Sequence, residues 1–391
     1  VGMIGQKEIV VSAEIIGSLG IKKGDYVEVS LAQEPESKLF IQKKLKCSPL
    51  SKSEIECIVK DIVKNALTET EIAYFVSGVY KCGMSHRETE YLVKAMVNVG
   101  DRLHFKGKVV DKHSIGGVAG NRTTPIVVAI CAAAGLIIPK TSSRAITSAA
   151  GTADVIESIA QVEFKKEEIK KIIKKTSGCM VWGGSLCLSP ADDKLIQVER
   201  ILHLDPEPQL LASVLSKKIA VGSKYVLIDI PFGHYAKVSR QKGLDLKRKF
   251  ESLGKEFGLK LKCVLTNGNE PIGHGIGPLL EIRDVISVLK RDDGCPKDLE
   301  RKAVFLAGLL FELCGRAKKS QGKKLANQLL NSGLAFKKFK QIIIAQRGRI
   351  PEEFKLGKFS HTLNATKNSK IKKIDNRTMN LLAVLAGSPM D

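Results

Sequence analysis

A glycine-rich segment between an expected strand and an expected helix constrains the fold most strongly. The segment, DKHSIGGVAGNRTT at residues 111–124, overlaps the apolar stretch KVVDK and leads into TPIVVAICAAAG. The first stretch predicts a strand, and the second predicts a helix with Thr124 at its N-cap and Pro125 at its first position. Main-chain amides at such a junction converge on one point, where the helix dipole adds positive potential.

The side chains of this segment suit an anion such as phosphate. Lys112 supplies a full positive charge, and Ser114, Thr123 and Thr124 supply hydroxyl donors. The segment lacks the G-x-x-x-x-G-K-[ST] spacing of a Walker A loop. The alternative is a glycine turn that only lets a strand and a helix pack closely, because glycine-rich loops alone are weak signals.

A second segment of the same character is PKTSSRAITSAAGTADVIE, residues 139–157, which again runs from an apolar strand into a helix. Its hydroxyl and arginine residues are Thr141, Ser142, Ser143, Arg144, Thr147, Ser148 and Thr152. Parallel strands present their carboxyl ends at one edge of a sheet, so we expect both segments to form one phosphate site. Alternatively, Thr152 only caps the helix ADVIE and Arg144 only forms a surface ion pair.

The order of apolar patterns predicts a mixed α/β protein of two or three domains, because 391 residues exceed one compact core. Residues 1–35 read as strand, helix, turn and strand, and residues 39–99 are helical. From residue 105 strands alternate with helices; the strand candidates are KVVDK, LIIPKT, YVLIDI and KLKCVLT. A helical stretch at 188–220 interrupts this alternation. The tail from 347 is short-stranded and lysine-rich, and it ends on the helix-like NLLAVLAG.

Charge and cysteine usage set further expectations. The net charge of +22 favours anionic partners such as nucleotides, phosphate, RNA or acidic lipid, although a lysine-rich surface explains it equally well. The nine cysteines form no C-x-x-C pair and no zinc-like cluster, which predicts reduced thiols in a cytoplasmic protein. The longest apolar run, residues 125–138, is too short to cross a bilayer.

These motifs resemble the thymidine phosphorylase/AMP phosphorylase family over nearly the whole chain. The resemblance extends through GCMVWGGSLCLSPADDKLIQVE, LDPEPQLLASVLSKKIAVGS, VLIDIPFGHYAKV and IGPLLEIRDVI, while GNRTT and SSRAITSAAGT resemble the branch that acts on nucleotides. It implies a class II nucleoside phosphorylase-like α/β fold with an all-helical domain and a mixed α/β domain. The implied boundaries are 1–35 for a partial β-rich domain, 38–100 with 188–220 for the helical domain, 101–187 with 221–345 for the phosphate-binding α/β domain, and 346–391 for a truncated α+β domain.

The resemblance also implies a reaction. Members of the nucleotide branch are pentosyltransferases that attack C1′ of AMP, and also of CMP and UMP, with inorganic phosphate. The products are the free base and ribose 1,5-bisphosphate, in nucleotide catabolism. A nucleoside monophosphate and phosphate are therefore the expected partners, with no metal or organic cofactor, no membrane and no specific nucleic acid. A homo-oligomer, a dimer or larger, is expected from the family alone.

Residue roles follow from the matching motif positions. By resemblance, the phosphate site comprises Lys112, Ser114, Gly117, Thr124, Ser142 and Thr152. The positions that bind the nucleotide are Gly117, Ser143, Arg144, Ala145, Ile146, Thr147, Ser148, Thr152, Ser213 and Lys237. Asp205 matches the proton donor, and His113 matches a histidine near the sugar or base. The chain departs from the family at Ala119, where proline is usual.

Three of these roles have plain alternatives in the sequence. Asp205, in LDPEPQLL, reads first as an N-cap with Pro206 at the first helical position, and an ordinary aspartate is ionised at neutral pH. Ser213 and Lys217 lie four apart on one helical face and are able to reach a base's edge or to face solvent. Lys237 is either a 5′-phosphate ligand or a surface lysine.

Other activities fit the sequence less well. A thymidine or pyrimidine nucleoside phosphorylase would have no need of Arg122 and Lys237. A phosphoribosyltransferase would show a pyrophosphate-binding motif in place of KHS. A noncatalytic RNA-binding protein is suggested only by the charge, and the 5% aromatic content offers no RNA-binding motif.

Overall fold

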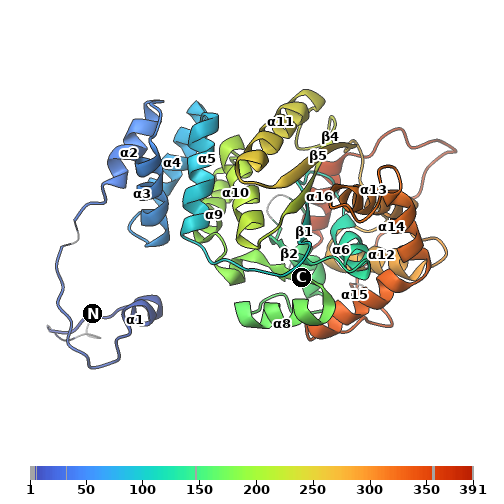
Figure 1. Cartoon of the computed structure of the whole chain (residues 1–391), viewed down its shortest axis with the longest axis horizontal. Helices are drawn as coiled ribbons and strands as arrows, with labels where there is room; N and C mark the ends of the chain where they lie inside the picture. Colours follow the sequence, from blue (N-terminus) through green and yellow to red (C-terminus); the bar gives the residue numbers. More distant parts are fainter. Residues whose placement is uncertain (1–4, 6, 32, 146–147, 355–356, 390–391) are drawn as a thin grey trace. The chain divides into compact units, whose positions relative to one another are not determined.

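The computed structural model describes residues 5, 7–31, 33–145, 148–354 and 357–389 (Figure 1). The chain divides into two compact units, Val1–Pro35 and Glu36–Asp391.

In the first unit, helix α1 (Ala13–Leu19) begins where Ser12 accepts a hydrogen bond from the Ile15 amide, and Gly20 is its C-cap. The described residues of this unit contain no strand. The strands expected in EIVVS and YVEVS are therefore wrong, since an isolated pair of strands is marginal in water.

The helical part of the second unit combines two stretches far apart in sequence. Its helices are α2 (Ser37–Leu45), α3 (Lys52–Val63), α4 (Glu69–Cys82), α5 (His86–Asn98), α9 (Pro190–Leu202) and α10 (Glu207–Ala220). Capping boxes start α3, α4 and α5 at Ser51, Thr68 and Ser85. Helix α9 packs on α3 and α4, and α10 packs on α5, which buries a shared apolar core (Figure 1).

The α/β part contains parallel strands. The strands are β1 (Val110–Ser114), β2 (Ile138–Ser142), β3 (Gly178–Trp182), β4 (Tyr225–Phe232) and β5 (Lys260–Asn267). One sheet has the order β1-β4-β5 and the other pairs β2 with β3, and a parallel bridge from Val109 to Ile137 joins β1 to β2. The four expected strands are formed, whereas β3 was not expected.

Helices cover the strands. They are α6 (Thr123–Ala133), α7 (Thr152–Glu157), α8 (Lys166–Thr176), α11 (Arg240–Glu256), α12 (Pro278–Lys290), α13 (Lys297–Leu313), α14 (Gly322–Asn331) and α15 (Leu334–Ala345), with a short 3-10 turn, η1, at Gly183–Leu186. Helix α6 is buried along almost its whole length, which explains its uninterrupted apolar sequence. Because β1 and β2 are parallel and adjacent, the segments that follow them leave the same edge.

Of the two expectations about the tail after residue 346, the terminal helix is confirmed and the strands are wrong. In the described residues after 346, the structure has helix α16 (Asn376–Leu385) and no strand. Expected strands in this lysine-rich tail have no partner there. Among the described residues, no helix is long and apolar enough to span a bilayer.

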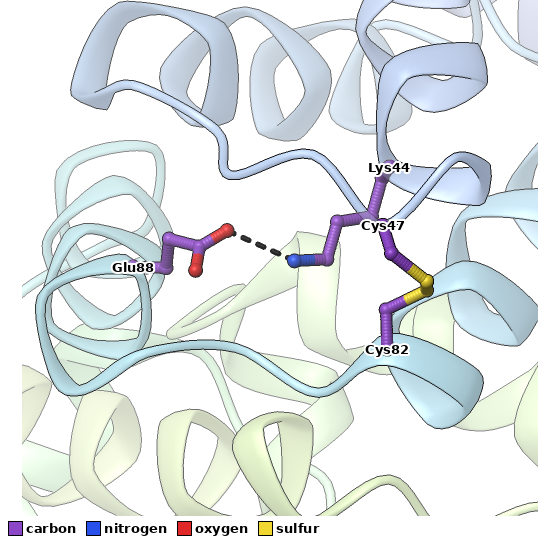
Figure 2. The surroundings of a disulfide bond; sticks show 4 residues. All are labelled: Lys44, Cys47, Cys82 and Glu88. Carbon is purple, nitrogen blue, oxygen red and sulfur yellow. Dashed lines mark hydrogen bonds and ion pairs between the residues drawn. A yellow bond between two sulfur atoms is a disulfide. The ribbon is translucent and has the colours of Figure 1, made fainter.

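The expectation that all cysteines are reduced is also wrong. Cys47 and Cys82 form a disulfide, because the packed helices α2 and α4 bring their Cα atoms to 5.2 Å (Figure 2). Beside it, the buried Lys44 ammonium lies 2.9 Å from the Glu88 carboxylate, which also accepts the Leu50 amide at 3.0 Å. The other seven cysteines, all in the described part of the chain, are free thiols.

Candidate active site

The segment after β1, residues 115–122, is here called loop 1. Its glycines Gly116, Gly117 and Gly120 have φ angles of 87°, 86° and 68°, in the region that favours glycine. A Cβ atom on Gly117 would lie 2.6 Å from the main-chain nitrogen of Lys237, so only glycine allows the two main chains to approach so closely. Loop 1 therefore has the glycine backbone expected from the sequence and contacts the loop that carries Lys237.

Lys112 lies at the base of loop 1. Its Nζ donates to the Thr123 hydroxyl at 2.9 Å and to the Thr124 hydroxyl at 3.3 Å, and the side chain is buried. Helix α6 begins at Thr123 with Arg122 at the N-cap, so the expectation that Thr124 is the N-cap is wrong. The threonine hydroxyls bind the lysine instead of the helix end, which concentrates a cation and two hydroxyls at one point.

The segment after β2, residues 143–151, is here called loop 2. Arg122 ties it to loop 1, because the guanidinium donates to the Thr152 hydroxyl at 2.9 Å and to the Ala150 carbonyl at 2.8 Å. The Glu281 carboxylate of α12 holds the same guanidinium at 2.6 Å. The structure thus places the two expected phosphate loops side by side.

Most of loop 2 is held by its own contacts. Ser142 donates to the Val181 carbonyl at 3.4 Å, and Ser148 donates to the Ala150 carbonyl at 2.9 Å. The Ala145 amide donates to Asp154 at 2.7 Å, and the Ser143 carbonyl accepts the Ala153 amide at 3.4 Å. Ile146 and Thr147 lie outside the described residues.

Two alternatives for loop 2 are now decided. Gly151, not Thr152, is the N-cap of α7, so the capping interpretation of Thr152 is wrong. The ion-pair interpretation of Arg144 describes the structure: its guanidinium contacts Glu157, lies 3.0 Å from Glu163 and stacks 4.9 Å from the Trp182 ring centroid. Ligand binding by Arg144 would require it to exchange these partners.

An aspartate missed by the sequence analysis lies at the same sheet edge. The fully buried Asp229 of β4 accepts from Ser114 at 3.3 Å and from Thr266 at 2.6 Å, and lies 3.2 Å from the Lys302 ammonium of α13. The available signal was a single carboxylate inside the apolar strand YVLIDI. Asp229 and Lys302 orient Ser114 beside Lys112.

A second polar group lies on the helical part. Ser213 donates to Asp192 at 2.8 Å, and the Lys217 ammonium lies 2.5 Å from Asp192 and 3.8 Å from Asp193. Burial alone would lower the pKa of Lys217, but the two carboxylates outweigh burial and raise that pKa. Burial raises the pKa of Asp193 to about 6. Asp192, assigned no role from the sequence, orients both residues expected to meet the base.

His113 of β1 is affected by charges from both groups, Lys112 on the loop side and Lys217 on the helical part. Burial holds its pKa well below the usual range, and the positive charges of Lys218, Lys140, Lys112 and Lys217 lower it further. The imidazole is therefore neutral at physiological pH and contributes no positive charge. Behind it, the buried Asp111 carboxylate pairs with Lys218 at 2.8 Å and Lys140 at 3.6 Å, which links α10 to β1 and β2.

Asp205 lies in the turn between α9 and α10. The N-cap of α10 is Pro206, so the interpretation of Asp205 as the cap is wrong. Its half-exposed carboxylate instead lies 2.6 Å from the Lys237 ammonium. Lys237 thus contacts loop 1 through its main chain and Asp205 through its side chain.

The arrangement offers an anion cradle and a nearby carboxylate. Amides, hydroxyls and the buried Lys112 suit a tetrahedral oxyanion, and Lys237 and Asp205 adjoin that cradle at Gly117. Within the described residues, no three His, Cys, Asp or Glu side chains form a group that could hold a metal.

Phosphate binding is expected to weaken above about pH 8. Burial lowers the pKa of Lys112 to about 8, with Lys302 and Arg122 opposing the stabilising charge of Asp229. Above this value the free protein loses the lysine charge, so the dissociation constant for inorganic phosphate is expected to rise about tenfold per pH unit. Calorimetric titration with inorganic phosphate across the pH range measures this, and an affinity that stays constant above pH 8 would contradict it.

Comparisons with known proteins give the class first. Residues 38–100 match the helical bundle domain of a glycosyl transferase family, and residues 106–336 match the a/b domain of that family. The crystal structure of anthranilate phosphoribosyltransferase from Thermus thermophilus has the same fold, with a TM-score of 0.65, 17% identity, and coverage of 79% of this chain and 99% of that one. The matches thus place the chain in a glycosyl transferase family with a helical bundle domain and an a/b domain.

Sequence relatives give the family. An AMP phosphorylase of Methanococcus aeolicus is 45% identical over 393 residues, spanning 100% of this chain and 78% of that protein. A Legionella pneumophila (strain Corby) protein with a provisional thymidine phosphorylase name is 45% identical over 374 residues, spanning 95% and 72%. The chain belongs to the glycosyl transferase family that contains these AMP phosphorylases, which confirms the resemblance and the fold class expected from the sequence.

Proposed function

We propose that the protein catalyses the phosphorolysis of nucleoside 5′-monophosphates. As a pentosyltransferase, the protein would convert AMP and phosphate to adenine and ribose 1,5-bisphosphate. CMP and UMP would be further substrates. A phosphate oxygen forms a bond to C1′ while the bond from C1′ to the base nitrogen breaks, and its electron pair leaves with the base, which takes up a proton. The observation that carries the proposal is the Arg122 link between the two loops, which makes one cradle beside Lys112. Family membership and the AMP phosphorylase names of the relatives support it.

The cradle is suited to the nucleophile. We propose that inorganic phosphate occupies it against Lys112, Ser114, Gly117, Thr124, Ser142 and Thr152. An anion held below C1′ stabilises the oxocarbenium character that develops as the base departs. Orientation within one site removes much of the entropic cost of a two-substrate reaction.

The ion pair of Asp205 and Lys237 links recognition to proton transfer. The 5′-phosphate of a nucleotide competes with Asp205 for the Lys237 ammonium, which it now contacts at 2.6 Å. A carboxylate that loses its cation and is covered by substrate is more easily protonated. Asp205 is then able to donate to the leaving base, whereas a nucleoside without a 5′-phosphate leaves the ion pair intact.

The helical group is proposed to meet the base. Ser213 and Lys217 are held by Asp192, and neutral His113 lies next to Lys112 and Ser114 on β1. Closure of the helical part on the α/β part would bring phosphate to C1′ and exclude water. We further propose that the enzyme acts as a cytoplasmic homo-oligomer without metal or organic cofactor.

A base-release assay tests the function. The chain is incubated with AMP, CMP, UMP, adenosine or thymidine, with and without phosphate, and the free base is measured. We expect phosphate-dependent release from the monophosphates and little from the nucleosides. Release from thymidine but not from AMP would favour a nucleoside phosphorylase, the activity suggested by the Legionella relative's name. No phosphate-dependent release from any substrate would refute the proposal.

A further inference from the structure

The C-terminal helix α16 is bonded to loop 1. The Asn376 side chain is fully buried; its Oδ1 accepts the Ala119 amide at 3.0 Å, and its Nδ2 donates to the Gly268 carbonyl at 2.9 Å. The Ala119 carbonyl accepts the Ile272 amide at 3.0 Å. Asn376 therefore joins loop 1 to the segment that follows β5, from a position more than 250 residues away in the chain.

Helix α16 and the residues that follow it are also hydrogen-bonded to loop 2. Asn380, one turn after Asn376, accepts the Ala149 amide at 3.1 Å, and the Ser388 hydroxyl donates to the Ala149 carbonyl at 2.5 Å. Residues four apart share one helical face, so the two asparagines present side-chain oxygens to both loops at once. Helix α16 thus spans the two loops that form the cradle.

The polar contacts account for the position of the helix. Asn376 is the single fully buried residue of α16, whereas Leu381, Leu382 and Leu385 are 58%, 54% and 76% exposed. Apolar packing therefore contributes little on that face. Buried amides such as that of Ala119 must be paired, and here the partner comes from α16.

We propose that Asn376 and Asn380 are positioning residues that hold loops 1 and 2 in the geometry that binds phosphate. This proposal rests on the proposed function of the cradle. The three positive-φ glycines give loop 1 many alternative conformations, so a contact that fixes Ala119 reduces the cost of ordering the loop around an anion. Neither asparagine is proposed to touch a substrate.

Paired variants test the proposal. Asn380→Leu removes the acceptor for the Ala149 amide at similar volume, whereas Asn380→Asp keeps an acceptor oxygen there. Leu381→Ala alters an exposed neighbour on the same helix and serves as the control. Asn376→Leu is the parallel change at loop 1. Each variant is compared with wild type for melting temperature, for KM of phosphate and of AMP, and for phosphate affinity by calorimetry with inorganic phosphate alone.

We expect KM and Kd for phosphate to rise about tenfold in Asn380→Leu and Asn376→Leu. The KM for AMP should change much less, Asn380→Asp should recover most of the phosphate affinity, and Leu381→Ala should match wild type. A lower melting temperature with unchanged phosphate affinity would show that α16 is only a structural support. If wild type binds phosphate without cleaving AMP, the calorimetric result still decides the positioning role while the phosphorylase function falls. If wild type binds no phosphate, both proposals are refuted.

Discussion

Asp205→Asn is expected to lower the turnover of AMP by about 10²–10⁴-fold, the usual contribution of a general acid. Asparagine keeps the size of the side chain and its ability to accept a hydrogen bond from Lys237, which lies 2.6 Å away. It carries no acidic proton for the departing base, however, so the C1′–base bond must break with the negative charge left on the base. Single-turnover release of adenine, with phosphate and enzyme in excess, isolates this step from product release.

The partner variant Lys237→Met distinguishes acid catalysis from substrate gating. It removes the cation that holds Asp205 and that is proposed to meet the 5′-phosphate. We expect the ratio of kcat/KM for AMP over adenosine to fall at least tenfold while adenosine turnover is kept or raised, because Asp205 is released from its cation. In Asp205→Asn the loss should fall on AMP, the substrate that frees Asp205 from Lys237. Asp245→Asn changes a part-exposed aspartate of α11 that pairs with its neighbour Arg248; it is the matched control and should be neutral.

Wild-type rates in a folded Asp205→Asn variant would exclude Asp205 as the acid. The structure then points to Glu199 of α9. Burial, reinforced by the negative charges of Asp192 and Asp205, raises the pKa of Glu199 to about 8, so this carboxyl is largely protonated at neutral pH. Glu199→Gln would be the next variant, and loss of turnover there would move the proton donor from the turn at Asp205 to helix α9.

The local sequence pattern predicted the helices and strands around the site, but it did not predict which side chains contact one another. The strands before both loops and the helices after them follow from apolar runs and glycines that lie next to each other in the chain. Thr124, Thr152 and Asp205 all have the residue type and spacing of helix caps, yet none is the cap. Their oxygens bind Lys112, Arg122 and Lys237, and no local pattern identifies a partner that lies 12 to 32 residues away.

The residues that the sequence did not point to share one property: the role of each depends on contacts with distant parts of the chain. Asp229 is a single carboxylate inside a strand, and Asn376 is an ordinary amide in a polar tail, until the fold places each against a loop of the cradle. Cys47 and Cys82 likewise have no motif spacing, and only the packing of α2 on α4 makes them neighbours. The strands expected at both ends of the chain were read from alternation alone, which specifies a strand only when a partner strand is present.

Lys112→Met is expected to reduce phosphate affinity by about 10²–10³-fold, comparable to removing a main oxyanion donor. Methionine has nearly the same length and is apolar, so it fills the buried space without supplying a charge or a donor to the Thr123 and Thr124 hydroxyls. The same substitution is expected to leave the free energy of unfolding unchanged or to raise it. Burial already lowers the pKa of Lys112 to about 8, which shows that the fold disfavours this charge.

Opposite signs for function and stability make this prediction specific. Calorimetry with inorganic phosphate and thermal unfolding measure the two effects on the same samples, and the alkaline loss of phosphate affinity should disappear in the variant. Lys218→Met is the contrasting control, because it removes the 2.8 Å partner of the fully buried Asp111 and should lower the melting temperature. If the Lys112→Met protein binds phosphate as tightly as wild type, Lys112 is not the cation that binds phosphate. The proposed attack on C1′ would then have no lysine charge to orient the phosphate.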